Sequence, residues 1–180
     1  MTEKKSGPNI AKLVIVLTLV SAVVAAILGG VNAITKDKIA AITEQKTNDA
    51  LAEVLPVNEG ETYTELDYTG DSTITHVWEA PSGHVVELVV SGAQSMIDLV
   101  VGVDNDGVVT GVSIIDHGET PGLGAKATES SFRDQYIGVN APAAVNKDGG
   151  SIQALTGATI TSRAVTDAVN TAMAAVAEIG

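Results

Sequence analysis

The longest run of apolar residues in the chain lies near its N-terminus. From Leu13 to Ile34 the sequence reads LVIVLTLVSAVVAAILGGVNAI, without a charged residue. A helix of about 20 residues crosses a hydrocarbon core of roughly 30 Å. A cleaved signal peptide is the alternative, but its apolar part is usually about 7–15 residues long and a small-residue cleavage motif follows it. This run is longer and no clear cleavage motif follows Gly29 and Gly30, so the pattern predicts an uncleaved transmembrane helix.

Basic residues flank this run on both sides. Three lysines precede it and two follow it: Lys4, Lys5, Lys12, Lys36 and Lys38. Lys and Arg are enriched on the cytoplasmic side of membrane helices. The small excess before the run predicts that residues 1–12 are cytoplasmic, that residues 13–34 span the membrane, and that the chain beyond lies outside the cytoplasm.

The helical pattern continues over residues 35–56. Apolar positions such as Ile42 and Leu51 recur among polar ones, and Pro56 ends the pattern because proline cannot continue a helix. This segment is predicted to be a stalk helix that leads into an extracytoplasmic domain over residues 57–180. The domain opens with an acidic, turn-rich stretch, residues 58–71, that is predicted to be a loop or an irregular strand.

Four segments rich in β-branched residues follow, and they predict a sheet. They cover residues 73–78, 84–90, 96–104 and 108–115. Pro81-Ser82-Gly83 separates the first two, and Asp104-Asn105-Asp106-Gly107 separates the last two; the second of these turns is a strong hairpin signal. The sheet is therefore predicted to be mainly antiparallel.

The C-terminal segment has the periodicity of an amphipathic helix, predicted to begin near Ser162 and to pack on the sheet. Its apolar positions recur at spacings of three and four residues: Val165, Ala168, Val169, Ala172, Met173 and Val176. The predicted fold class is therefore α+β, a mainly antiparallel sheet with packed helices, preceded by one transmembrane helix.

Composition excludes several kinds of function. The 180 residues carry a formal net charge of -12, with 10 basic residues scattered along the chain, which argues against a nucleic-acid partner. The absence of cysteine excludes disulfides, thiolate metal sites and iron–sulfur clusters, and the three histidines have no metal-ligand spacing. No metal site is expected, no set of catalytic side chains stands out, and any redox chemistry requires an organic cofactor.

The first candidate motif, Leu155-Thr156-Gly157-Ala158-Thr159-Ile160-Thr161-Ser162, precedes the predicted C-terminal helix. Its small residues allow close approach of a ligand to the backbone. The free amides and positive dipole end of a helix N-terminus suit a phosphate group. The alternative is that Thr161 or Ser162 merely caps the helix.

The second candidate motif follows the predicted hairpin and reads DHGETPGLG over residues 116–124. Two glycines around a leucine, behind a proline, indicate an ordered loop at the edge of the sheet. The alternative is an ordinary turn, in which His117 is a surface histidine.

Together, in this order and behind an N-terminal span, the two motifs resemble the FMN-binding domain of the G subunit of Rnf-type ion-translocating electron transport complexes. The related C subunit of the sodium-pumping NADH:quinone reductase shares this domain. The resemblance runs over nearly the whole chain and implies a covalent flavoprotein. In the family the last threonine of the S/T-G-A-T motif forms a phosphoester with FMN, which a separate flavin transferase delivers from FAD. That residue is Thr159 here, and Thr161 is the competing attachment site.

The resemblance also implies roles for the neighbouring residues and for the whole chain. The remainder of the first motif would shape the phosphate cradle and the transferase recognition site: Thr156, Gly157 and Ala158. The second motif would form the loop against the flavin ring: Glu119, Thr120, Gly122, Leu123 and Gly124. The chain would then relay electrons within an Rnf-type ferredoxin:NAD oxidoreductase in the cell membrane. Its partners would be the other membrane subunits, and it would turn over no substrate alone.

The sequence departs from the family pattern at two places. The acidic residue that often stands six positions before the attachment threonine is replaced by Gln153, with Asp148 nearby at a different spacing. The glycine-aromatic-glycine segment is Gly92-Ala93-Gln94-Ser95, which lacks the aromatic residue. These departures concern recognition by the transferase more than the attachment of FMN.

Two other functions stay open: an anchored FMN domain that passes electrons to an extracellular acceptor, and a tethered binding module without redox chemistry, in which the first motif is only a helix cap.

Overall fold

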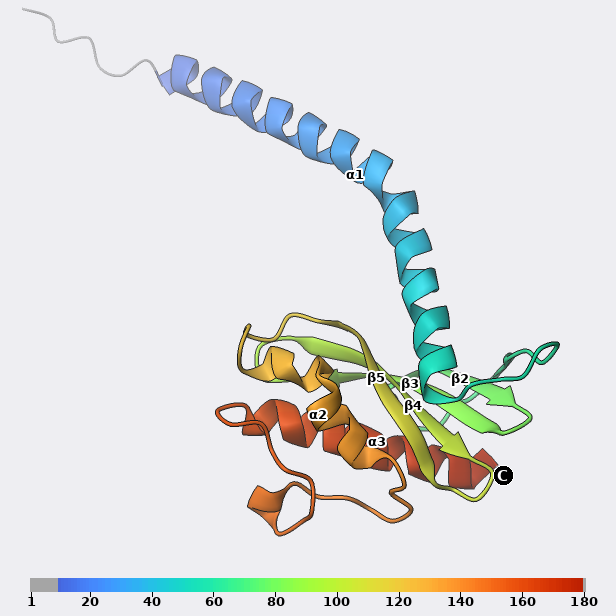
Figure 1. Ribbon diagram of the computed structural model, residues 1–180. Helices are drawn as coiled ribbons and strands as arrows, with labels where there is room; N and C mark the ends of the chain where they lie inside the picture. The colour runs from blue at the N-terminus through green and yellow to red at the C-terminus, as the bar shows by residue number, and fades with distance from the viewer. Residues whose placement is uncertain (1–9, 180) are drawn as a thin grey trace, which may run out of the picture. The chain divides into compact units, whose positions relative to one another are not determined.

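The computed structural model describes residues 10–179, and Lys4 and Lys5 lie outside these residues (Figure 1). The chain divides into two compact units, residues 1–44 and residues 45–180. Helix α1 (Ile10–Val54) begins in the first unit and ends in the second. Within residues 10–179 it is the one helix long and apolar enough to span a membrane, and the apolar side chains of its first part are exposed.

The second unit contains a five-stranded antiparallel sheet whose strand order follows the chain order (Figure 1). The strands are β1 (Thr64–Leu66), β2 (Ile74–Ala80), β3 (Gly83–Ser91), β4 (Met96–Asp104) and β5 (Val109–His117). The four predicted strands and the antiparallel pairing are confirmed. The stretch predicted as a loop or irregular strand contributes the short edge strand β1.

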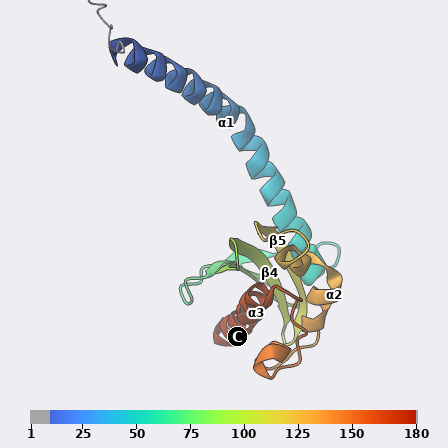
Figure 2. The same cartoon turned by 90° about the vertical axis from the view of Figure 1, so that its left-hand side faces the viewer.

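Between β5 and the last helix, the chain forms short helical segments that the sequence pattern did not predict. They are η1 (Gly124–Thr128), α2 (Ser130–Arg133), η2 (Asp134–Tyr136) and η3 (Asn146–Asp148), and they lead to helix α3 (Thr159–Ile179). Figure 2 shows α3 packed against the sheet with α2 beside it. The predicted α+β class, with helices on an antiparallel sheet, is confirmed.

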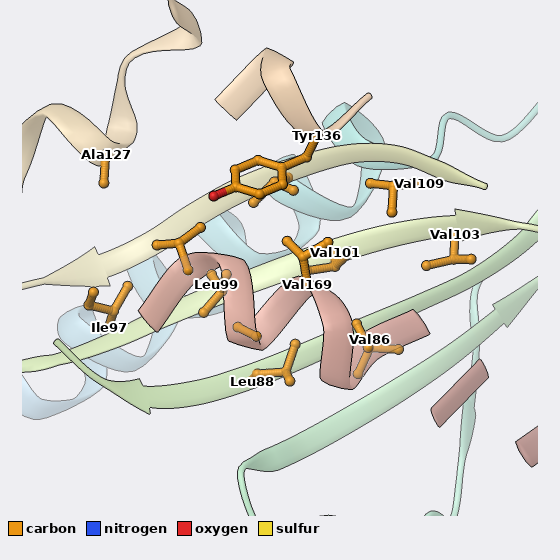
Figure 3. Close-up of a cluster of buried hydrophobic side chains, with 14 of the residues drawn as sticks. Val86, Leu88, Ile97, Leu99, Val101, Val103, Val109, Ala127, Tyr136 and Val169 are labelled. Atoms are coloured by element: carbon orange, nitrogen blue, oxygen red, sulfur yellow. The ribbon is translucent and has the colours of Figure 1, made fainter. Parts of the chain in front are cut away.

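The main core lies between α3 and one face of the sheet (Figure 3). Alternate residues of β3 and β4 point into it, as a strand's period of two requires. Phe132 and Tyr136 from the short helices complete it, with ring planes at 81° and centroids 5.6 Å apart. The buried residues of these strands and of α3 are Val86, Leu88, Ile97, Leu99, Val101, Val103, Val165, Ala168, Val169, Ala172 and Val176.

The end of α1 covers the opposite face of the sheet. Ala50, Leu51, Val54 and Leu55 form a second buried cluster with Ala80, Val85, Val100 and Ile115. Polar contacts fix this segment, because Ser113 Oγ and Arg133 Nη1 both donate to the carboxylate of Glu53, at 2.5 and 2.9 Å. The end of α1 is therefore part of the domain, and Pro56 follows it.

A buried carboxyl group stands on this same face. Glu87 is 8% exposed, and its carboxylate faces His76, whose Nε2 lies 3.9 Å from Oε2. Burial, with the nearby charge of Asp98, raises the pKa of Glu87 to about 7, although His76 opposes the shift. Burial and the charge of Asp116 likewise raise the pKa of Asp98. Glu87 and Asp98 therefore influence each other's protonation, and the charges of His76 and Asp116 act on them as well.

The raised pKa of Glu87 predicts a falling stability as pH rises. Between its ordinary value of 4.5 and about 7, the folded protein holds a proton that the unfolded chain has released. The free energy of unfolding must therefore decrease across this window. Glu87→Gln removes the dependence, and above pH 7 we expect the variant to be more stable by about 1 to 3 kcal/mol.

The measurement is guanidinium unfolding of both proteins at several pH values, followed by the fluorescence of Trp78. This is the single tryptophan of the chain and it stacks on His76. A difference between the two proteins that is constant from pH 4 to pH 8 would contradict the assignment.

Candidate functional site

A tight turn delivers the chain into α3. The amide of Ala158 donates to Leu155 O at 3.0 Å, and Gly157 has a φ of 78°, which a glycine adopts without strain. The first helical hydrogen bond runs from Ser162 N to Ala158 O. The helix therefore begins at Thr159, three residues before the predicted start near Ser162.

The side chains of Thr161 and Ser162 explain this difference. Both are fully buried and neither caps the helix as an N-cap residue, because they are its third and fourth residues. Ser162 Oγ donates to Ala158 O and accepts a hydrogen bond from Leu155 N, both at 2.9 Å. These contacts tie the turn to the helix, so the interpretation of either hydroxyl as the cap is wrong.

The hydroxyls of the first motif differ strongly in exposure. Thr161 and Ser162 are 0% exposed, whereas Thr159 is partly exposed and Thr156 is exposed. Thr159 is the first residue of α3, where the first amides of a helix have no partner within it. The motif thus presents one hydroxyl at the helix start while two others are enclosed.

Glu119 of the second motif lies inside the protein. It is 5% exposed, and Oε1 accepts hydrogen bonds from the amides of Gln94 at 2.9 Å and Ser95 at 3.3 Å. Oε2 accepts a hydrogen bond from Thr161 Oγ1 at 2.7 Å. One carboxylate therefore joins the turn between β3 and β4, the loop after β5 and the first turn of α3.

Two glycines make the space for this carboxylate. A Cβ added to Gly124 would overlap Glu119 Oε2 and lie 2.8 Å from Thr161 Oγ1, and one added to Gly92 would overlap Oε1. A Cβ added to Gly157 would lie 3.1 Å from Leu123 Cδ2. The two motifs therefore meet through a buried polar contact, and Leu123 lies against the position that a side chain at residue 157 would occupy.

The hydrogen bonds keep the carboxylate ionised. Burial by itself raises the pKa of Glu119, but donation from Gln94, Thr161 and Ser95 outweighs burial and sets the pKa below its usual range. Glu119 therefore holds a negative charge beside the start of α3, where the helix dipole favours one.

The rest of the second motif lies at the surface. Thr120 and Gly122 are exposed, Gly122 with a φ of 77°, and Leu123 is 43% exposed. On the helix, Ile160 is 60% exposed. Apolar side chains thus stand open beside the partly exposed Thr159, while Glu119 and Gly124 of the same motif are buried.

A surface groove runs beside the first motif, and the sequence pattern did not reveal it. Its lining comes from η1, α2, η2 and the segment before α3: Lys126, Ser131, Phe132, Gln135, Gln153, Ala154, Leu155 and Thr156. Gln135 grips the backbone of Gln153, accepting from its amide at 2.6 Å and donating to its carbonyl at 3.4 Å. A lone glutamine in an irregular segment carries no sequence signal for such a contact.

Both departures from the family pattern have a defined place. Gln153 is exposed and held by its backbone. Asp148 pairs with Arg163, four residues after Thr159, through bonds of 2.7 and 2.6 Å, and this pairing lowers the pKa of Asp148. Asp148 thus reaches the first turns of α3 despite its different spacing. The Gly92–Ser95 turn, which lacks the aromatic residue, supplies the amides of Gln94 and Ser95 to Glu119.

Two family models match the chain. One, described as the FMN-binding domain, covers residues 92–174, and the other, described as the RnfG N-terminal region, covers residues 1–54. The G subunit of the ion-translocating oxidoreductase complex of Methanosarcina acetivorans is 34% identical, over 92% of this chain and 93% of its own length. The chain belongs to the family of G subunits of Rnf-type ion-translocating oxidoreductase complexes. The resemblance inferred from the motifs is confirmed.

Other G subunits are similarly related. That of the Na⁺-translocating ferredoxin:NAD⁺ oxidoreductase complex of Acetobacterium woodii is 35% identical, over 88% of this chain and 87% of its own. The G subunit of the proton-translocating complex of Clostridium ljungdahlii is 34% identical, over 96% and 95%. Relatives from a sodium-translocating and a proton-translocating complex thus have nearly the same similarity to this chain.

A solved structure shares the fold. The C subunit of the Na⁺-translocating NADH-quinone reductase of Parabacteroides distasonis superposes with a TM-score of 0.58, covering 80% of this chain and 94% of that one. Its sequence identity is 18%, so this structure supports only the fold and no function.

The residues at the start of α3 fit a tethered FMN. Thr159 is partly exposed, the first amides of α3 suit the phosphate, and Leu123 and Ile160 offer apolar surface for a ring system. The Gly157 turn keeps side chains away from the backbone there, Leu123 excepted. The domain that matches the FMN-binding family therefore presents a partly exposed threonine at the start of α3, and the buried Glu119 and Gly124 lie behind it.

The slot around Glu119 makes Gly124 sensitive to substitution. Gly124→Ala places a methyl group against the buried carboxylate, and we expect a loss of about 1 to 3 kcal/mol in unfolding free energy because the core cannot relax. Thermal unfolding followed by circular dichroism measures it.

Gly118→Ala serves as the control, because its Cβ would lie 3.0 Å from Ser95 Cβ and 3.1 Å from Ser95 Oγ, a short and partly exposed side chain, and would not meet the carboxylate. Equal losses in both variants would mean that the carboxylate slot has no special importance.

Proposed function

We propose that this G subunit relays electrons between other subunits of an ion-translocating oxidoreductase complex, and that it turns over no substrate alone. The relatives named above are subunits of such complexes, and two of those complexes are named ferredoxin:NAD⁺ oxidoreductases. Residues 92–174 match the FMN-binding domain. Bound FMN supplies chemistry in both one- and two-electron steps.

In this proposal FMN is held as a phosphoester on Thr159. The observation that carries it is the difference in exposure between the two candidate threonines of the first turn of α3. Thr159 is partly exposed at the helix start, whereas the competing acceptor Thr161 is buried and its hydroxyl already donates a hydrogen bond to Glu119. A transferase acting from outside can reach Thr159 without unfolding the helix.

The attachment reaction balances with FAD as the donor and a separate flavin transferase as the catalyst. Thr159 Oγ1 forms a bond to the phosphorus on the riboflavin side of FAD, and the phosphorus–oxygen bond of the pyrophosphate breaks. AMP leaves, and the hydroxyl proton is removed as the bond forms. No oxidation or reduction takes place in this step.

The chain's own residues then have distinct tasks in this proposal. The amides at the start of α3 and the Thr156–Ala158 turn hold the phosphate by hydrogen bonds and the helix dipole. The exposed Leu123, Thr120 and Gly122 form the surface against which the flavin lies. Glu119 and Gly124 support that surface from inside.

The proposed topology follows the lysine distribution around the apolar segment. Residues 1–12 are cytoplasmic, residues 13–34 cross the membrane, residues 35–56 form the stalk, and residues 57–180 form the extracytoplasmic domain. The exposed apolar side chains of α1 and the match of residues 1–54 to the RnfG N-terminal region support a retained anchor.

The attachment site is tested by intact mass. The full chain is expressed in membranes together with a flavin transferase, as wild type and as Thr159→Ala. We expect the wild type to gain the mass of one FMN less one water and the variant to gain nothing, because the acceptor oxygen is missing.

Thr171→Ala is the matched control. Thr171 is another partly exposed threonine of α3, remote from the helix start, and its variant should be modified like the wild type. Modification of Thr159→Ala would exclude Thr159 as the acceptor, and an unmodified wild type would oppose the covalent assignment.

The topology is tested by cysteine labelling, because the chain has no cysteine of its own. Ser82→Cys lies in the exposed turn between β2 and β3 and should react with a membrane-impermeant maleimide added outside intact cells. Ser6→Cys should react only after the cells are opened. The reverse pattern would show the opposite orientation.

A further inference from the structure

The contact between Glu119 and Thr161 sits where three segments distant in sequence meet. The carboxylate binds the turn at Gln94 and Ser95 through one oxygen and α3 through the other, with 2.7 Å between Oε2 and Thr161 Oγ1. Both side chains are buried, at 5% and 0% exposure. Because both carboxylate oxygens accept hydrogen bonds from the protein, Glu119 affects the site by holding these segments in place.

Because of helix geometry, the contact between Glu119 and Thr161 also determines the direction in which the Thr159 side chain points. Successive residues of an α-helix are turned by about 100°, so Thr159 and Thr161 point about 200° apart. With Thr161 held toward Glu119 in the interior, Thr159 must face nearly the opposite way. The partial exposure of Thr159 and the 60% exposure of Ile160 agree with this arrangement.

We propose that Glu119 and Thr161 are positioning residues that set the rotation of the first turn of α3 and thereby determine which hydroxyl accepts FMN. This inference rests on the proposed attachment at Thr159. Neither residue touches the flavin. Their contact holds the acceptor outward and keeps Thr161, the nearest competing threonine, out of reach of the transferase.

Strict geometry around the contact supports the proposal. Gly124 and Gly92 leave no room for a Cβ beside the carboxylate, so both backbone segments pack directly against it. The next residue of the helix, Ser162, is hydrogen-bonded to Leu155 and Ala158 of the preceding turn. The first turn of α3 is thus held by the side-chain hydrogen bonds of two consecutive residues. Of these, only the hydrogen bond of Thr161 reaches the second motif.

The test compares Thr161→Val with Thr161→Ser in the full chain. Valine keeps the shape but removes the hydroxyl and leaves Oε2 of a buried carboxylate unpaired, whereas serine retains the donor. We expect Thr161→Val to slow the modification of Thr159 by the transferase on the order of tenfold or more, because misplacement of a reacting group is costly. Thr161→Ser should retain most of the wild-type rate.

Thr166→Val is the control for stability alone. Thr166 is also buried in α3, at 2% exposure, and its hydroxyl donates to Ser162 O and contacts Tyr136 Oη. It should lose stability comparably and yet be modified at the wild-type rate. Rates come from a time course of intact mass, sites from peptide mapping and stability from thermal unfolding.

A second readout needs no flavin. Hydrogen exchange on unmodified protein should be faster at the amides of Gln94 and Ser95 in Thr161→Val than in wild type, and unchanged there in Thr166→Val. If wild type is modified and Thr161→Val is modified equally fast, the positioning role is wrong while the proposed function stands. Equal slowing in Thr166→Val would likewise overturn it, and an unmodified wild type would strike the proposed function itself.

Discussion

The buried carboxylate of Glu119 is the interaction on which the arrangement of the site depends. A charged group taken out of water is costly unless hydrogen bonds replace the water, and here two amides and one hydroxyl do so. The amides and the hydroxyl come from parts of the chain that are distant in sequence from each other and from Glu119. The cost of leaving any one of them unpaired therefore ties the turn after β3, the loop after β5 and the start of α3 to one geometry.

The two faces of the sheet have separate tasks. One face receives α3 and the short helices around Phe132 and Tyr136, and it supports the candidate FMN site. The other receives the end of α1, where Glu53 is held by Ser113 and Arg133. Arg133 belongs to α2, which also lines the groove beside Thr156. The end of α1 and the surroundings of the site are thus connected within one domain.

The sequence was most informative where its periodicity was regular. The strand predicted over residues 96–104 is β4 itself, because Asp104-Asn105-Asp106-Gly107 marks its end and β-branched residues fill it. Helix α3 was recognised but begins three residues early, at Thr159, since Thr161 and Ser162 resemble caps although their hydroxyls bond inside the protein. Exposure follows from three-dimensional packing, so the sequence motif predicts Glu119 at the ligand surface although it is 5% exposed. Residues 125–154 have no sustained period, and there the buried Phe132 and Tyr136 escaped prediction.

The order of the strands has a consequence for the sequence of folding and cofactor attachment. Since every strand pairs with its neighbour in sequence, the sheet can assemble by local hairpin steps as the chain emerges. The contact between Thr161 and Glu119, in contrast, joins residues 42 apart in sequence and requires the C-terminal helix to dock on the sheet. The hydroxyl of Thr159, the proposed acceptor, is therefore displayed correctly only after α3 has docked. If FMN is attached there, cofactor loading would follow folding and would mark those molecules that have reached the native state.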